Sequence, residues 1–184
     1  RSAAAAGMLA MAGRGTAGSP AAGSGAAGMS AGAAGIAAAA SGETGRMVGI
    51  TAAHNAVRAR IMNPAPTPAL PPLSWSTEIA KTAQAYAEKL AAGGNCLNLV
   101  HSQAPGLGEN LAGYQGQMAT PIQVVEGWAA EEECLTFGPI TRTGEECDMT
   151  CAKAKFSSGC GHYTQVVWRG TSEVGCGVAS CGTG

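Results

Sequence analysis

All eight Trp, Tyr and Phe residues of this 184-residue chain lie between Trp75 and Trp168. Large side chains supply much of the buried area of a protein core, so this distribution confines the core to the later part of the chain. The first 40 residues are roughly two-thirds Ala and Gly, a composition that buries too little surface to offset chain entropy. We therefore predict a disordered, low-complexity Ala/Gly/Ser-rich linker over residues 1–45 and one folded domain over residues 46–184.

The cysteines are confined to the same part of the chain. They are Cys96, Cys134, Cys147, Cys151, Cys160, Cys176 and Cys181. They lack the two paired short spacings of a zinc ribbon or finger, and their density in one domain indicates disulfides and an oxidising compartment. The four between Cys134 and Cys160 allow three pairings, and we expect them to pin a loop. Because seven is an odd number, one thiol is expected to be free, intermolecular or without its partner.

Charge and hydropathy narrow the functional classes. The net charge of −1 provides no basic surface for nucleic acid. No run approaches the ~18 apolar residues of a membrane span. Residues 3–12 are either more linker or the end of a signal-peptide core. The low charge and the Ala/Gly-rich composition suggest a bacterial exported protein.

Apolar periodicity predicts three helices followed by short strands. The helices are expected over residues 47–62, over 77–92 with Ser76 as N-cap, and from Pro121 onward after Thr120. Residues 135–158 have loop composition, and strands are expected over 162–168 and 174–180. The fold class is therefore α+β, with helices layered against a short antiparallel sheet.

Four residues outside the cysteines have the chemistry of a site: His101, Glu109, Glu131 and His162. Two imidazoles and two carboxylates can form a divalent-metal shell, with Zn²⁺ the usual ion, or a proton-transfer pair. Spacing alone does not show that they meet, and each residue could instead be an ordinary surface or core residue.

The segment GHYTQVVW (161–168) resembles the signature of the CAP superfamily, which includes cysteine-rich secretory proteins, antigen 5 and pathogenesis-related protein 1. Further similar motifs follow the family order: AHNAVRA (53–59), LSWSTEIAKTAQAYAEKL (73–90), HS (101–102), GENLA (108–112), W-x-x-E (128–131) and VGCGVASC (174–181). The resemblance covers about residues 48–181 and implies the α-β-α sandwich of that family.

The resemblance also implies that His101, Glu109, Glu131 and His162 meet at the floor of an open cleft. Glu132 takes the place of Glu131 if the family motif aligns one residue further along this helix. Other motif residues have structural roles by the same resemblance: His54 packs the first helix, and Asn55 and Arg58 bond the backbone.

Family members continue past the position of Cys181 into another strand that carries a further cysteine. The resemblance therefore implies a domain truncated before its last strand. It also implies that Cys176 or Cys181 lacks a partner in this chain.

These features predict a secreted module, not a catalyst, that holds a metal or polar group in the cleft. By resemblance it also binds a sterol, a lipid or another small apolar ligand, and the linker could tether it to a cell envelope. The alternative is a zinc-dependent hydrolase, peptidase or esterase-like, with Glu109 or Glu131 as general base. The chain has no His-Glu-x-x-His motif, and Ser102 beside His101 is a weak indication of a nucleophile. A purely structural envelope spacer, without ligand or metal, is the third class.

Overall fold

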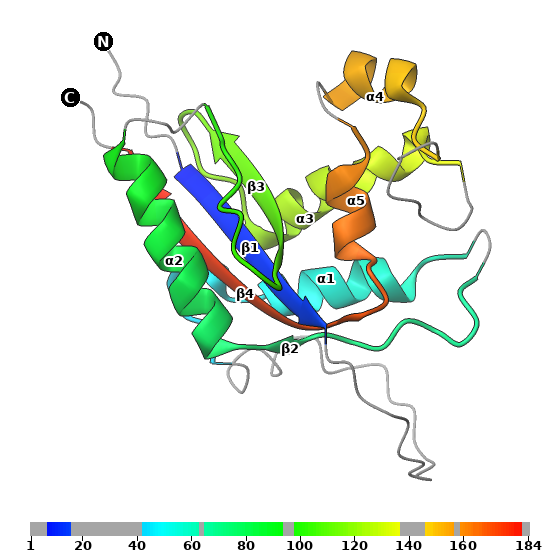
Figure 1. Ribbon diagram of the computed structural model, residues 1–184, viewed down its shortest axis with the longest axis horizontal. Coiled ribbons are helices and arrows are strands. Elements are labelled where there is room, and N and C mark those ends of the chain that lie inside the picture. The colour runs from blue at the N-terminus through cyan, green and yellow to red at the C-terminus, as the bar shows by residue number, and fades with distance from the viewer. Residues whose placement is uncertain are drawn as a thin grey trace, which may run out of the picture.

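The computed structural model describes residues 7–15, 42–62, 65–93, 98–136, 146–156 and 159–181. Its sheet has the order β2-β4-β1-β3, with α2 on one face and α1, α3 and α5 on the other (Figure 1). The strands are β1 (Gly7–Gly15), β2 (Ser74–Trp75), β3 (Gly108–Tyr114) and β4 (Thr171–Ser180). The helices are η2 (Gly45–Met47), α1 (Ile50–Ala59), α2 (Thr77–Ala92), α3 (Pro121–Ala129), η3 (Ala130–Cys134), α4 (Met149–Phe156) and α5 (Gly161–Val166). This mixed architecture is consistent with the α-β-α sandwich that the resemblance implies.

Two of the predicted helices begin where their capping residues stand. The Ser76 hydroxyl accepts a hydrogen bond from the backbone N–H of Ile79 at 3.4 Å, and α2 ends before Gly93. Thr120 and Gln123 form a capping box around Pro121 at the start of α3. None of the described helices is long and apolar enough to cross a membrane.

Strand β1 differs from the predicted disordered tether. Residues 7–15 pair antiparallel with both β3 and β4, so that Met11 lies opposite Asn110 on one side and Cys176 on the other. The two flanking strands offer backbone donors and acceptors on both sides, and this pairing outweighs the weak strand propensity of Gly and Ala. The rest of the predicted linker up to residue 41 lies outside the described residues, so its disorder and the domain boundary remain predictions.

The prediction of a strand over residues 162–168 is wrong, because Gly161–Val166 form helix α5. A carboxylate from η3 accepts hydrogen bonds from the first turn of α5, and this contact overrides the strand propensity of the segment. The second predicted strand, 174–180, lies within β4. The described elements that were not predicted include β2, β3 over GENLAGY, and α4 within the expected loop.

The disulfides select one of the three pairings that the spacing allowed. Cys134 is bonded to Cys151 and Cys147 to Cys160, so α4 is fixed against η3 and the start of α5. Cys181 is also disulfide-bonded, whereas Cys96 lies outside the described residues. Among the described cysteines Cys176 is free, which confirms that one of Cys176 and Cys181 lacks a partner. It is buried, and burial raises the pKa of its thiol, so it is poorly reactive.

Helix α2 packs closely on β4 because two strand positions facing it are glycines. A Cβ atom at Gly177 would lie 2.3 Å from the backbone Cα of Gln84, and one at Gly175 would lie 2.2 Å from the backbone N of Ala80. The Gln84 side chain also donates to the carbonyl of Val178 and accepts from its N–H, both at 2.9 Å. Gln84 thereby satisfies backbone groups of β4 in place of another strand.

We predict that Gly177→Ala lowers the free energy of unfolding by at least ~2 kcal/mol, because the new methyl meets backbone atoms that cannot rotate away. The matched control is Gly127→Ala within α3, where a Cβ would meet nothing within 4 Å. The control should be neutral or up to ~1 kcal/mol stabilising, since Ala favours helix over Gly. Urea unfolding of both variants measures the difference, and equal stabilities would contradict this account of the α2–β4 contact.

Candidate functional site

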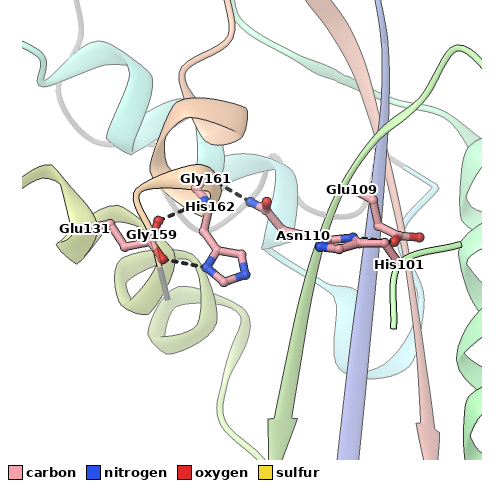
Figure 2. Close-up of a pocket in the computed structure, with 7 residues that line it drawn as sticks. All are labelled: His101, Glu109, Asn110, Glu131, Gly159, Gly161 and His162. Atoms are coloured by element: carbon pink, nitrogen blue, oxygen red, sulfur yellow. Dashed lines mark hydrogen bonds and ion pairs between the residues drawn. The ribbon is translucent and has the colours of Figure 1, made fainter. Parts of the chain in front are cut away.

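The four sequence-predicted site residues line one pocket of about 260 Å³ (Figure 2). The lining residues are His101, Glu109, Asn110, Glu131, Gly159, Gly161 and His162. They come from the segment before β3, from β3 itself, from η3 and from the start of α5. Glu132, the alternative to Glu131, is not among them.

Glu131 holds both the ring and the backbone of His162. One carboxylate oxygen, Oε1, accepts from Nδ1 of the ring at 2.6 Å. The other, Oε2, accepts from the backbone N–H groups of His162 at 2.8 Å and of Tyr163 at 3.1 Å. These two N–H groups lie in the first turn of α5, so the carboxylate caps that helix from outside. The side chain of Glu131 is only 2% exposed, which makes these bonds strong and their loss unfavourable.

Trp128 supports the same ring from one helical turn earlier. Its indole stacks against the imidazole of His162 with ring centroids 6.2 Å apart and an interplanar angle of 23°. Its Nε1–H donates to the carbonyl of Leu111 on β3 at 3.4 Å. The W-x-x-E spacing therefore has a physical reason, because residues three apart share a helix face and both contact His162 here.

The second imidazole is held in the same way. Nδ1 of His101 lies 2.8 Å from Oε1 of Glu109, and the same oxygen accepts from the backbone N–H of Ser102 at 2.9 Å. The Ser102 hydroxyl accepts from the N–H of Ala104 at 3.1 Å, so it stabilises the turn of this loop. His101 is half-exposed, whereas the Glu109 side chain is 12% exposed.

The geometry gives the two carboxylates a different role from the one we predicted. Both glutamates bind the Nδ1 side of an imidazole, and Figure 2 shows the other ring nitrogens turned toward the space between His162 and His101. No group of three or more His, Cys, Asp or Glu side chains is arranged to hold a metal ion within the part of the chain that the structure describes. The two histidines and two glutamates are therefore not arranged as four direct ligands of one metal ion. Two imidazole nitrogens therefore face the pocket, and the glutamates orient the rings from behind.

Sequence reasoning did not select Asn110, although it directly follows Glu109. Asn110 is buried, and its Nδ2 donates to the backbone carbonyl of His162 at 3.0 Å. Strand β3 lies at an edge of the sheet, and consecutive residues of a strand point to opposite sides. The pocket therefore wraps around this edge, with Glu109 on one side and Asn110 on the other. Gly159 and Gly161 complete the lining. Gly161 opens the GHYTQVVW motif but was not selected as a site residue, and no motif included Gly159.

A second pocket of about 230 Å³ adjoins the first. Its lining comprises His101, Ser102, Gln103, Ala104, Leu107 and Glu109. The His101–Glu109 pair borders both pockets. Gln103 has a positive φ of 59°, which is uncommon for a residue other than Gly.

The other residues of the first-helix motif lie outside the site, as the resemblance implies. His54 is fully buried in α1, and its Nδ1 donates to the carbonyl of Ile50 at 2.7 Å. Asn55 bonds both the N–H and the carbonyl of Leu73. The guanidinium of Arg58 donates to backbone carbonyls, those of Pro71, Val166, Trp168 and Thr171. The predicted backbone bonds of Asn55 and Arg58 are confirmed.

An α-β-α domain with two carboxylate-held imidazoles in one pocket defines the class of protein. The chain belongs to the CAP cysteine-rich secretory protein family, whose model matches residues 51–184. It is 39% identical over 132 residues to pathogenesis-related protein 1A of Nicotiana tabacum, which covers 72% of this chain and 65% of that protein. It is 38% identical over 132 residues to a pathogenesis-related protein of PR-1 type from Sambucus nigra, covering 72% of this chain and 66% of that one. It is also 42% identical over 110 residues to Protein PRY2 of Saccharomyces cerevisiae, covering 60% of this chain and 27% of that one.

The chain thus spans slightly less than two thirds of the length of these plant relatives. A comparison with solved structures gave no significant match. The relatives are plant and yeast proteins, so they do not support the bacterial source that composition suggested.

We predict that Glu131→Gln lowers the free energy of unfolding by about 2 kcal/mol, because charge-assisted bonds to the first turn of α5 become neutral ones. Glu133→Gln is the matched control in the same helix, and it should change stability by less than ~1 kcal/mol because Glu133 is exposed and pairs with Lys155 at the surface. Urea unfolding with the disulfides intact measures both. Equal losses would show that the position of Glu131 has no special role.

We predict that His54 makes the fold less stable below pH 6.5. Burial lowers its pKa from 6.5 to about 4, so between these pH values the unfolded chain binds a proton that the folded chain excludes. Unfolding is therefore favoured progressively as the pH falls from 6.5 to 4, by about 3 kcal/mol in total, and this penalty is absent above pH 6.5.

The variant His54→Gln lacks the titrating ring but keeps a donor for the Ile50 carbonyl. Its unfolding free energy should change about 3 kcal/mol less between pH 7 and pH 4 than that of the unmodified protein, whatever its absolute stability. Parallel pH profiles for the two proteins would refute the assignment to His54.

Proposed function

We propose that this domain is an extracellular binding module whose pocket holds a divalent metal ion through His101 and His162. Zn²⁺ is the ion that we propose before any other, because it is the usual partner of imidazole ligands. One observation carries the proposal: each imidazole is held at Nδ1 by a carboxylate, and the two Nε2 edges face the same space. In the neutral imidazole, a carboxylate acceptor at Nδ1 selects the tautomer with its proton there and leaves the lone pair on Nε2 for a metal ion. When bound, such an ion would act as a Lewis acid toward a polar group or a water molecule.

The extracellular part of the proposal rests on the disulfides and the relatives. Two disulfides pin α4, and stable disulfides belong to oxidising compartments. Two relatives are pathogenesis-related proteins by name, and we extend a defence-related role to this chain as part of the proposal. We further propose that the N-terminal segment attaches this extracellular domain to a cell envelope.

The pocket favours a polar ligand group over the sterol or lipid that the resemblance implies. Five of its seven lining residues are His, Glu or Asn, and burying an acyl chain against them would leave their polar atoms unpaired. A polar head group or a metal ion keeps those atoms bonded.

The zinc-dependent hydrolase is the second proposal, and the geometry restricts its general base. Both oxygens of Glu131 already accept hydrogen bonds in a nearly inaccessible position, so it is poorly placed to take a proton from water. Glu109 is more exposed and borders both pockets, so it is the better placed of the two.

The test is a calorimetric titration of the metal-free domain with Zn²⁺. His101→Ala and His162→Ala should each weaken binding by at least about tenfold, and the double variant should abolish it, because each removes one of two imidazole donors. Glu88→Gln, on the exposed face of α2, is the control and should bind as the unmodified protein does.

An unmodified protein that takes up no Zn²⁺, or one whose affinity survives loss of both histidines, would exclude the metal site. The zinc-loaded protein is then assayed against a panel of peptides and esters. Turnover that disappears in Glu109→Gln supports the hydrolase, and binding without turnover supports the module.

A further inference from the structure

We propose that the side-chain carbonyl of Asn110 is a third donor of this site and makes it a cation site together with the two imidazoles. This inference rests on the proposed function and names a residue that the two-His, two-Glu pattern does not include.

The first support is the way the amide of Asn110 is held. The residue is only 1% exposed, yet it lines the pocket. Its Nδ2 donates to the carbonyl of His162 at 3.0 Å, which fixes the amide and leaves Oδ1 as its other end. None of the described residues donates a hydrogen bond to that oxygen, whereas amide oxygens of buried residues normally have a partner. A ligand in the pocket would provide one.

The second support is position. Figure 2 shows Asn110 between the ring of His162 and that of His101, with its amide beside the same open space. His162 and Asn110 are also joined directly, because the amide bonds the backbone of the histidine. The third donor is therefore fixed relative to one of the two imidazoles.

The third support is charge. In the neutral form of each imidazole the proton lies on Nδ1 toward a carboxylate, so the three atoms offered to a ligand are acceptors: two Nε2 atoms and one Oδ1. The pocket lining includes Glu109 and Glu131 and no Lys or Arg. An anion would face lone pairs and negative charge, whereas a cation is stabilised by both.

A purely structural role for Asn110 predicts a different result from a ligand role. If the residue only donates to the His162 carbonyl, an Asp in its place loses that donor and weakens the site. If its oxygen contacts the metal, an Asp supplies a charged oxygen of the same shape and strengthens binding. The two roles thus differ in the sign of one substitution.

The experiment titrates metal-free Asn110→Asp, Asn110→Ala and unmodified protein with Zn²⁺. We expect Asn110→Asp to bind about tenfold more tightly and Asn110→Ala about tenfold more weakly, because ligand charge and ligand number set affinity. Gln103→Glu is the control for general attraction, since it adds the same charge to the adjoining pocket. Asn110→Asp binding that is no tighter than that of the unmodified protein, or a gain equal to that of Gln103→Glu, overturns the inference.

Urea unfolding of each metal-free variant shows whether it is folded. If Asn110→Asp does not fold, NMR of the unmodified protein provides the test through the ¹³C resonance of the Asn110 side-chain carbonyl. Direct contact with the metal shifts this resonance when Zn²⁺ is added. A resonance that does not move refutes the contact. Failure of the unmodified protein to bind Zn²⁺ overturns the proposed function and this inference together. Binding that depends on both histidines but not on Asn110 overturns only this inference.

Discussion

The carboxylate of Glu131 is the interaction on which the rest of the site depends. A buried carboxylate is unfavourable unless it is fully hydrogen-bonded, and this one accepts from the ring of His162 and from two backbone N–H groups of α5. The same side chain therefore determines the conformation of residues 161–163 and the orientation of the imidazole. Because both effects come from one group, the fold of this segment and the geometry of the pocket are established together.

Helix α5 is held at its other end by a buried cation. Arg58 donates to the carbonyls of Val166 and Trp168, where the helix dipole is negative, while Glu131 lies at the positive end. A helix of six residues is not stable alone in water, so these contacts and the Cys147–Cys160 disulfide at its N-cap supply its stability. The imidazole of His162 thus stands on a short element fixed at both ends, which favours a preorganised site.

The sequence predicted those parts whose cause is local. The starts of α2 and α3 follow from Ser76 and Thr120, whose caps act within three residues. The resemblance placed all four site residues around one pocket, which composition alone could not do. The predicted strand over 162–168 failed because its conformation depends on Glu131, some thirty residues earlier. Asn110 was missed because its partner, the His162 carbonyl, is a backbone atom distant in sequence, and no residue pattern marks such an acceptor.

The arrangement also explains how two carboxylates can border one small pocket. Each carboxylate accepts hydrogen bonds from its own imidazole and from backbone N–H groups, so its charge is stabilised before any ligand binds. Had both glutamates pointed into the pocket, their mutual repulsion would have favoured protonation of one of them. Turning them behind the rings keeps the negative charge close to the pocket, while the atoms that face the ligand are neutral acceptors. A set of two histidines and two glutamates is therefore not evidence for four metal ligands, because here the carboxylates position the imidazoles.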